Sequence, residues 1–217
     1  MKSQVQTPQI DIPFAKRHKC WFCEEPCNLT FQYISTSQCA HPSLSVPCCK
    51  ECLQFAQKNQ LNSIWNCRDA VKDSLMTRYQ KHLAIGINWT EQELEESEFE
   101  CKALGGFKKS AWFMYTVARD RINAPGWPIY INGVAIDDHQ GHDPFQFDGM
   151  AYTSVYRAIQ HYAKHKSLDH KFLADLVRVL GERRFGFCIR LAQIHIAASA
   201  EMKRHVLAEL QQQEHDN

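Results

Sequence analysis

Residues 20–52 read CWFCEEPCNLTFQYISTSQCAHPSLSVPCCKEC and contain seven of the ten cysteines of this 217-residue chain. Two C-x-x-C pairs bracket the stretch: Cys20 with Cys23, and Cys49 with Cys52. A tight turn of this spacing presents two thiolates to one metal ion, and two such turns complete a tetrahedral site. The segment is too short and polar to build a core of its own, so metal binding would supply folding free energy. The sequence therefore predicts one structural Zn²⁺ ion held by these four cysteines.

The remaining thiols of the stretch leave alternatives open. Cys48 could replace its neighbour as a ligand, but the C-x-x-C register selects Cys49. Cys27 and Cys39 could form a partial second site with His41, yet their spacing matches no common zinc pattern, and small buried apolar side chains are the favoured interpretation. His41 is interpreted as a surface histidine, with a zinc ligand or a catalytic remnant as alternatives.

Composition is that of an ordinary soluble protein, with 44% hydrophobic and 23% charged residues and a formal net charge of +1. No apolar run is long enough to cross a bilayer, so no membrane partner is expected. The first residues lack the apolar region of a secretory signal. Cysteines in such a chain are expected in a reducing compartment, where clustered thiols bind metal, and the predicted localisation is cytoplasmic. A net charge of +1 excludes a strongly basic protein but leaves a local basic face open.

Sequence patterns divide the chain into three parts. Residues 1–18 are predicted to be a flexible arm, residues 19–124 a zinc-knuckle module with helices, and residues 125–217 β-hairpins with a C-terminal helical domain. The expected fold class is mainly α with small β-hairpins (α+β), in which the zinc module is followed by a helical bundle.

Apolar residues at three- and four-residue steps predict a long helix that ends near residues 86–88; its face consists of Ile64, Cys67, Val71, Leu75, Tyr79 and Leu83. Thr90 and Glu93 form the capping box of a second helix, which is expected to continue to Gly105–Gly106. A third helix is predicted over 108–122.

Asn132-Gly133 and Asp148-Gly149 each lie between apolar residues, a pattern typical of type I′ turns, and they predict two short hairpins. Ser154 and Asp169 are expected to cap the next two helices. Apolar residues over 189–210 fall on one helical face and predict a single long terminal helix.

The segments CWFCEEP and SVPCCKECLQFAQ resemble the paired knuckles of zinc-binding HNH-like (treble-clef) modules, in which a Val-Pro-x-Cys-x-x-Cys turn leads into a helix. Val46, Pro47, Cys49 and Cys52 match that turn. Residues 20–104 are also similar to a group of uncharacterised bacterial and phage proteins, with a long basic helix (SIWNCRDAVKDSLMTRYQKHL) and a tryptophan-led acidic helix (NWTEQELEES) after the knuckle. The resemblance implies a treble-clef-like zinc module.

The chain departs from the HNH pattern at the catalytic pair. HNH nucleases carry an Asp/Glu-His pair on the hairpin after the first knuckle, but NLTFQYISTSQ contains neither His nor acid. Phosphodiester hydrolysis needs a base that activates water and a cation that stabilises charge. The favoured interpretation is therefore non-catalytic, and a divergent metal-dependent nuclease is the alternative.

Such a nuclease would use His41 or the loop DDHQGHD. Carboxylates and imidazoles of that loop could bind a divalent metal, together with an i,i+4 histidine pair on the following helix. A solvated polar loop is the favoured interpretation. The residues concerned are Asp137, Asp138, His139, His142, Asp143, His161 and His165.

Two groups of basic residues leave nucleic acid open as a partner, with a solvated charged face and ordinary helix packing as the alternatives. One group lies along the first long helix, near Trp65 and Tyr79, and consists of Arg68, Lys72, Arg78 and Lys81. Another, Lys171 and Arg178, lies in a segment that resembles the small helix-turn-helix modules attached to homing-type nucleases; the resemblance is carried by Tyr152, Ser154, Val155 and Ala158. The predicted function is a zinc-stabilised, non-catalytic protein of bacterial or phage type that associates with DNA or RNA, and a protein-interaction adaptor is a further alternative.

Overall fold

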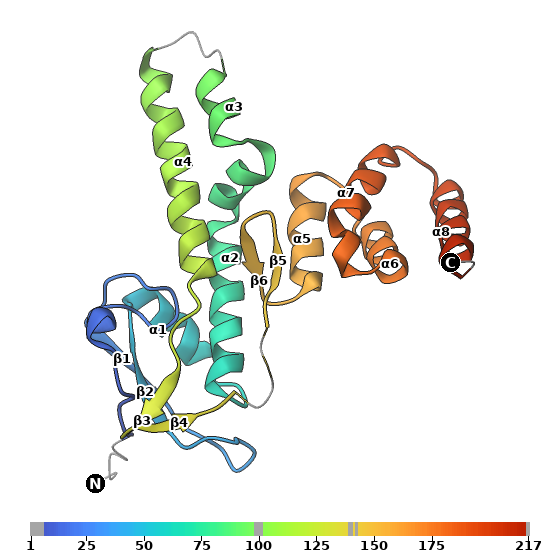
Figure 1. Cartoon of the computed structure of the whole chain (residues 1–217). Helices are drawn as coiled ribbons and strands as arrows, with labels where there is room; N and C mark the ends of the chain where they lie inside the picture. The colour runs from blue at the N-terminus through green and yellow to red at the C-terminus, as the bar shows by residue number, and fades with distance from the viewer. Residues whose placement is uncertain (1–6, 98–101, 139–140, 142, 216–217) are drawn as a thin grey trace. The chain divides into compact units, whose positions relative to one another are not determined.

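The computed structural model describes residues 7–97, 102–138, 141 and 143–215. Within these residues helices dominate, and the strands form three two-stranded antiparallel sheets (Figure 1). This architecture confirms the mainly α fold with small hairpins. The chain divides into two compact units, named here the N-terminal unit (Met1–Gly86 with Glu91–Thr153) and the C-terminal unit (Ser154–Asn217 with Ile87–Thr90).

The elements are, in chain order, η1 (Phe14–Lys16), β1 (Leu29–Tyr33), β2 (Leu44–Cys48), α1 (Lys50–Lys58), α2 (Ile64–Asn88), α3 (Glu91–Glu96), α4 (Lys102–Asn123), β3 (Ile129–Ile131), β4 (Val134–Ile136), β5 (Phe145–Phe147), β6 (Met150–Tyr152), α5 (Val155–His165), α6 (His170–Leu180), η2 (Glu182–Arg184), α7 (Phe185–Ile194) and α8 (Ala200–His215). Among the described residues, none of these helices combines the length and the apolar character that a bilayer crossing requires.

The β1–β2 hairpin forms the base of the cysteine-rich module. Its strands pair with Leu29 opposite Cys48, and β2 is buried along its whole length. β1 alternates instead, so that Phe31 faces inward and packs edge-on against Phe22 at 6.0 Å between ring centroids. The backbone N–H of Trp21 donates to the Pro47 carbonyl at 2.9 Å. The residues of the first C-x-x-C turn thus pack against the β1–β2 hairpin, and the second turn begins directly after β2, so both turns adjoin the same small apolar core.

Helix α2 buries the face that its sequence periodicity predicts, with the exception that Tyr79 is only half-buried. Towards its C-terminal end α2 meets α4 at Gly86. A Cβ atom at Gly86 would lie 2.2 Å from the buried Tyr115 ring, so glycine permits this close approach of the helices.

Both hairpins predicted from Asn-Gly and Asp-Gly are present. Asn132 and Gly133 have φ of 52° and 78°, and Asp148 and Gly149 have φ of 51° and 71°, as type I′ turns require. The hairpins belong to the N-terminal unit, whereas the sequence division at residue 125 assigned them to the C-terminal part. Each hairpin is bonded to an earlier part of this unit. Asn123 at the end of α4 donates to the Gly149 carbonyl and accepts from the Ala151 N–H, and the Asp11 carboxylate accepts from the N–H groups of Asn132 and Gly133.

Two helix boundaries differ from the prediction. Helix α3 ends at Glu96, and α4 runs through Gly105 and Gly106, where a stop was expected. Each interior glycine costs about 1 kcal/mol, which the packing of a 22-residue helix can offset. The expected long terminal helix is wrong: it is divided into α7 and α8, because Ser199 accepts a hydrogen bond from the Met202 N–H and caps the second helix.

The C-terminal unit packs around α6. Ser154 and Asp169 accept hydrogen bonds from the N–H groups of Arg157 and Phe172, which confirms both predicted caps. Helix α6 contacts α5, α7 and α8, and its Leu173 side chain is fully buried. This unit therefore has its own apolar core.

Candidate metal centre

The two C-x-x-C turns bring four sulfur atoms together. The Sγ atoms of Cys20, Cys23, Cys49 and Cys52 all lie within 4.8 Å of one another, and all four cysteines are free thiols. Cys23 Sγ lies 3.8 Å from Cys49 Sγ. A tetrahedral ion with metal–sulfur bonds of about 2.3 Å spaces its sulfurs by about 3.8 Å. Within the described part of the chain, this is the one group of three or more His, Cys, Asp or Glu side chains that could hold a metal ion.

The first turn is closed by backbone hydrogen bonds. The N–H of Cys20 donates to the Glu25 carbonyl at 2.8 Å, and the N–H of Glu24 donates to the Cys20 carbonyl at 2.8 Å. Glu24 has a φ of 56°, a left-handed conformation that reverses the chain directly after Cys23. Both thiols of this turn are therefore directed to the same side.

The second turn is the start of α1. Cys49 is the N-cap residue, and its sulfur accepts a hydrogen bond from the Cys52 N–H at 3.5 Å. The positive end of the helix dipole favours a thiolate at this position. Placing Cys52 one turn into the helix turns its side chain back towards Cys49, so the helix itself sets the spacing of this pair.

The cluster is closed to solvent on most sides. Cys20, Cys23 and Cys52 are buried and Cys49 is half-buried. Hydrogen bonds with the other sulfurs, that of Cys20 first, lower the pKa of Cys49 and of Cys23. Contacts with neighbouring sulfurs raise the pKa of Cys20, that of Cys23 first, and the pKa of Cys52, that of Cys20 first.

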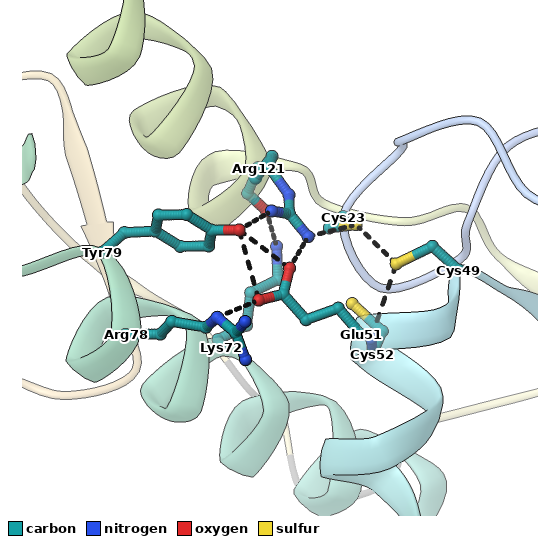
Figure 2. A network of polar contacts seen from close by, with 8 residues as sticks. All are labelled: Cys23, Cys49, Glu51, Cys52, Lys72, Arg78, Tyr79 and Arg121. Atoms are coloured by element: carbon teal, nitrogen blue, oxygen red, sulfur yellow. Dashed lines mark hydrogen bonds and ion pairs between the residues drawn. The ribbon is translucent and has the colours of Figure 1, made fainter. Parts of the chain in front are cut away.

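A partly buried polar network lies against one side of the sulfur cluster (Figure 2). Arg121, in the last turn of α4, donates from Nη2 to Cys23 Sγ at 3.7 Å and to Glu51 Oε2 at 2.6 Å. Its Nη1 donates to the Tyr79 hydroxyl at 2.6 Å, and Tyr79 in turn donates to Glu51. Burial lowers the pKa of Arg121, but the Cys23 sulfur and the Glu51 carboxylate outweigh burial and keep the guanidinium charged.

Sequence reasoning missed this network. Arg121 lies 98 residues from Cys23, and no local pattern connects the two. Only Glu51 could have been suspected from the sequence, because it is the acidic residue inside the Cys49–Cys52 turn.

The other cysteines of the stretch stay outside the cluster. Cys48 is buried in β2, and its pKa is raised to about 12 by burial. Cys27 and Cys39 are half-exposed and not fully buried as expected. Cys39 Sγ accepts a hydrogen bond from the Tyr33 hydroxyl at 3.6 Å. The possible second site is therefore not assembled among the described residues.

His41 corrects the sequence interpretation, because it is 5% exposed and not a surface histidine. Its Nε2 accepts the N–H of Ile64, the first residue of α2, at 2.9 Å. Its Nδ1 lies 2.8 Å from the Pro42 carbonyl and must donate to it. Burial lowers the pKa of His41, in keeping with this neutral tautomer. His41 thus caps α2 and has no ring nitrogen left for a metal or for proton abstraction.

The basic residues predicted along α2 serve different roles. Lys72 is buried, and its ammonium donates to the carbonyls of Arg121, Ile122 and Ala124 at the end of α4. Arg68 is largely buried and donates to the Pro125 carbonyl at 3.1 Å.

Arg78 and Lys81, the other two residues of that group, lie on the surface. Arg78 pairs with Glu51 at 2.7 Å, and Lys81 is exposed. Of the four basic residues predicted along α2, two are thus mostly buried and two are on the surface.

Lys171 and Arg178 lie on the exposed face of α6, with side chains 89% and 76% exposed. Both pair with Asp175, at 3.5 Å and 2.7 Å. Arg183, Arg184 and Arg190 are exposed further along the chain. This part of the C-terminal unit presents more basic than acidic side chains.

The loop DDHQGHD provides no metal site among the described residues. His139 and His142 lie outside those residues, and Asp143 is exposed. His161 and His165 on α5 do lie together, with ring centroids 4.9 Å apart. Burial, with a smaller contribution from His165, lowers the pKa of His161 to about 4.

The buried His161 predicts an acid-sensitive C-terminal unit. Its folded-state pKa of about 4 lies below the unfolded value of about 6.5, so the unfolded chain binds the proton more tightly. The stability that neutral His161 contributes is fully present above about pH 6.5 and is lost as the pH falls towards 4. At about pH 5 the loss should reach about 2 kcal/mol, measured by NMR-monitored urea unfolding. A His161→Leu variant should lose most of this pH dependence, and equal stability of the native unit at about pH 7 and pH 5 would contradict it.

Comparison of the chain with protein-family models, with curated proteins and with solved structures gives no match.

Proposed function

We propose that Cys20, Cys23, Cys49 and Cys52 hold one structural zinc ion, and that this ion stabilises a non-catalytic protein that associates with nucleic acid. The observation that carries the proposal is the closed group of four sulfurs, spaced for one tetrahedral ion. Zinc is the metal that proteins most commonly hold in Cys₄ sites. Four protein ligands leave no open position for water or substrate, which favours a structural role over a catalytic one.

The surroundings of the site support a non-catalytic role. The order turn, hairpin, turn and helix is the one that the resemblance to HNH-like modules implies. An HNH nuclease would need a base on the β1–β2 hairpin, whose strands LTFQY and LSVPC contain no acid and no histidine. The nearby His41 has both ring nitrogens engaged.

Helix α6 is the proposed nucleic-acid contact. Residues 166–169 join it to α5, a short connection of the kind found in helix-turn-helix motifs. Its buried face consists of Phe172, Leu173, Leu176, Val177 and Leu180. The opposite face presents Lys171 and Arg178, whose exposed cationic groups can reach backbone phosphates. Asp175 neutralises one charge of this pair, and Arg183 and Arg184, which lie in η2 shortly after α6, add to the proposed contact.

The test has two parts. Metal analysis of the full chain, purified without chelator, should find zinc near one equivalent. Fluorescence anisotropy with a labelled duplex should show binding at low salt, and the affinity should fall steeply as the salt concentration rises. A Lys171→Glu/Arg178→Glu variant should bind about tenfold more weakly or worse. The matched control is Lys58→Glu/Lys109→Glu, which reverses two exposed charges of the N-terminal unit and should change affinity much less.

Absence of zinc would refute the first part, and absence of any retained duplex or single strand at low salt would refute the second. A zinc-loaded chain that binds no nucleic acid would favour the adaptor, for which α4 exposes Phe107 (65%) and Phe113 (64%). Cleavage of the probe with Mg²⁺ or Mn²⁺ would favour the nuclease.

A further inference from the structure

We propose that Arg121 is a charge-compensating residue of the metal centre, which protects the Cys23 thiolate and slows release of the metal. The inference rests on the proposed zinc site and extends it to a residue outside the ligand set. Arg121 comes from α4, 98 residues beyond Cys23, and its guanidinium donates to the Cys23 sulfur at 3.7 Å (Figure 2).

The charge of the site calls for such a residue. Four thiolates outweigh a divalent cation by two negative charges, and three of the four cysteines are buried. A buried excess charge is costly unless it is paired or hydrogen-bonded. Hydrogen bonds from charged donors are the stronger kind, and Arg121 supplies one directly to a ligand atom.

Lys72 is the second cation near the site, but it acts differently. Its ammonium donates to the carbonyls of Arg121, Ile122 and Ala124, so its hydrogens are directed to the backbone. Lys72 therefore fixes the end of α4, the segment from which Arg121 extends. Arg121 is the residue of this pair that bonds to sulfur.

The guanidinium is held in one orientation. Glu51 accepts from Nη2 at 2.6 Å and Tyr79 accepts from Nη1 at 2.6 Å. Glu51 also pairs with Arg78, which fixes its carboxylate from the solvent side. Glu51 lies between Cys49 and Cys52 in sequence, so the acid that orients Arg121 belongs to the second C-x-x-C turn itself. Groups that orient and tune metal ligands in this way commonly change metal affinity 10- to 100-fold when mutated.

The expected chemical consequence is specific to one sulfur. A thiolate that accepts a hydrogen bond from a guanidinium shares its electron density and attacks electrophiles more slowly. Cys23 should therefore be protected relative to the other ligands. Without Arg121, Cys23 should react faster than it does in the native chain.

The test uses the zinc-loaded full chain and limited iodoacetamide, which forms an S–C bond to the thiolate as iodide leaves. In Arg121→Met, zinc transfer to a chromogenic chelator should be about tenfold faster than in the native chain, and peptide mapping should find that carbamidomethylation of Cys23 increases more than that of the other three ligands. Arg121→Lys keeps the charge and should recover part of the protection. The Co²⁺-substituted Arg121→Met protein should show a shifted sulfur-to-cobalt charge-transfer band.

The matched control is Arg78→Met, which removes a cation from the same Glu51 without touching a sulfur. It should release zinc at close to the native rate. Zinc release from Arg121→Met at the native rate, or an increase in labelling of Cys23 no larger than that of the other three ligands, would overturn the role of Arg121 while leaving the zinc site intact. A native chain without zinc would instead refute the proposed function.

Discussion

A chelator is expected to unfold the cysteine-rich module while the C-terminal helices stay folded. Structural zinc sites contribute about 10–16 kcal/mol of binding free energy, which the proposed ion would supply as folding free energy. The module over residues 20–58 has a small apolar core, and its two turns are joined by the sulfur cluster. Without the cation, the negative charge of the clustered thiolates would no longer be compensated, and the two turns should separate.

Hydrogen exchange followed by mass spectrometry is the measurement, because it reports on each unit separately. Peptides over 20–58 should lose protection after EDTA treatment, and peptides of α5 to α7 should keep it. Cys52→Ser should behave like the chelated native chain, since it removes one ligand. Cys39→Ser, which changes a half-exposed thiol outside the cluster, is the matched control and should retain protection. Full protection of residues 20–58 in EDTA would contradict a structural metal.

The parts of the structure that the sequence predicts are set by local chemistry. C-x-x-C spacing selects the four clustered cysteines, because each pair lies within one turn. Asn-Gly and Asp-Gly select hairpin turns through their tolerance of positive φ. Ser154 and Asp169 select helix starts through hydrogen bonds that span three residues.

Long-range partners cannot be found in this way. Arg121 reaches Cys23 and Glu51 only after α2 and α4 have packed together. His41 was assigned to the surface because nothing near it in sequence shows that it caps Ile64, 23 residues away. Lys72 fits an exposed basic stripe by periodicity, yet the carbonyls at the end of α4 draw it inside. The break before α8 is a different error, since Ser199 was an available local signal.

Trp21 joins the candidate metal centre to the rest of the N-terminal unit. It lies between Cys20 and Cys23 in sequence and is fully buried. Its Nε1–H donates to the Trp127 carbonyl at 3.0 Å, which fastens the segment after α4 to the first knuckle. The Arg68 guanidinium lies over its ring, 5.4 Å from the centroid. Gly126, with a φ of 73°, lets the chain pass close to the Trp21 backbone.

Trp21→Ala is therefore expected to destabilise the N-terminal unit by about 3–5 kcal/mol, through lost burial and the cavity that remains. Trp21→Phe keeps much of the ring but leaves the Trp127 carbonyl without its donor, and should cost about 1–3 kcal/mol. Urea unfolding of the zinc-loaded chain, with hydrogen exchange as the readout for this unit, would measure both. Phe113→Ala removes an aromatic ring that is 64% exposed and should change stability by about 0.5 kcal/mol at most. If Trp21→Ala cost no more than Phe113→Ala, the first knuckle would be held by its metal alone, and the packing of Trp21 would contribute nothing to it.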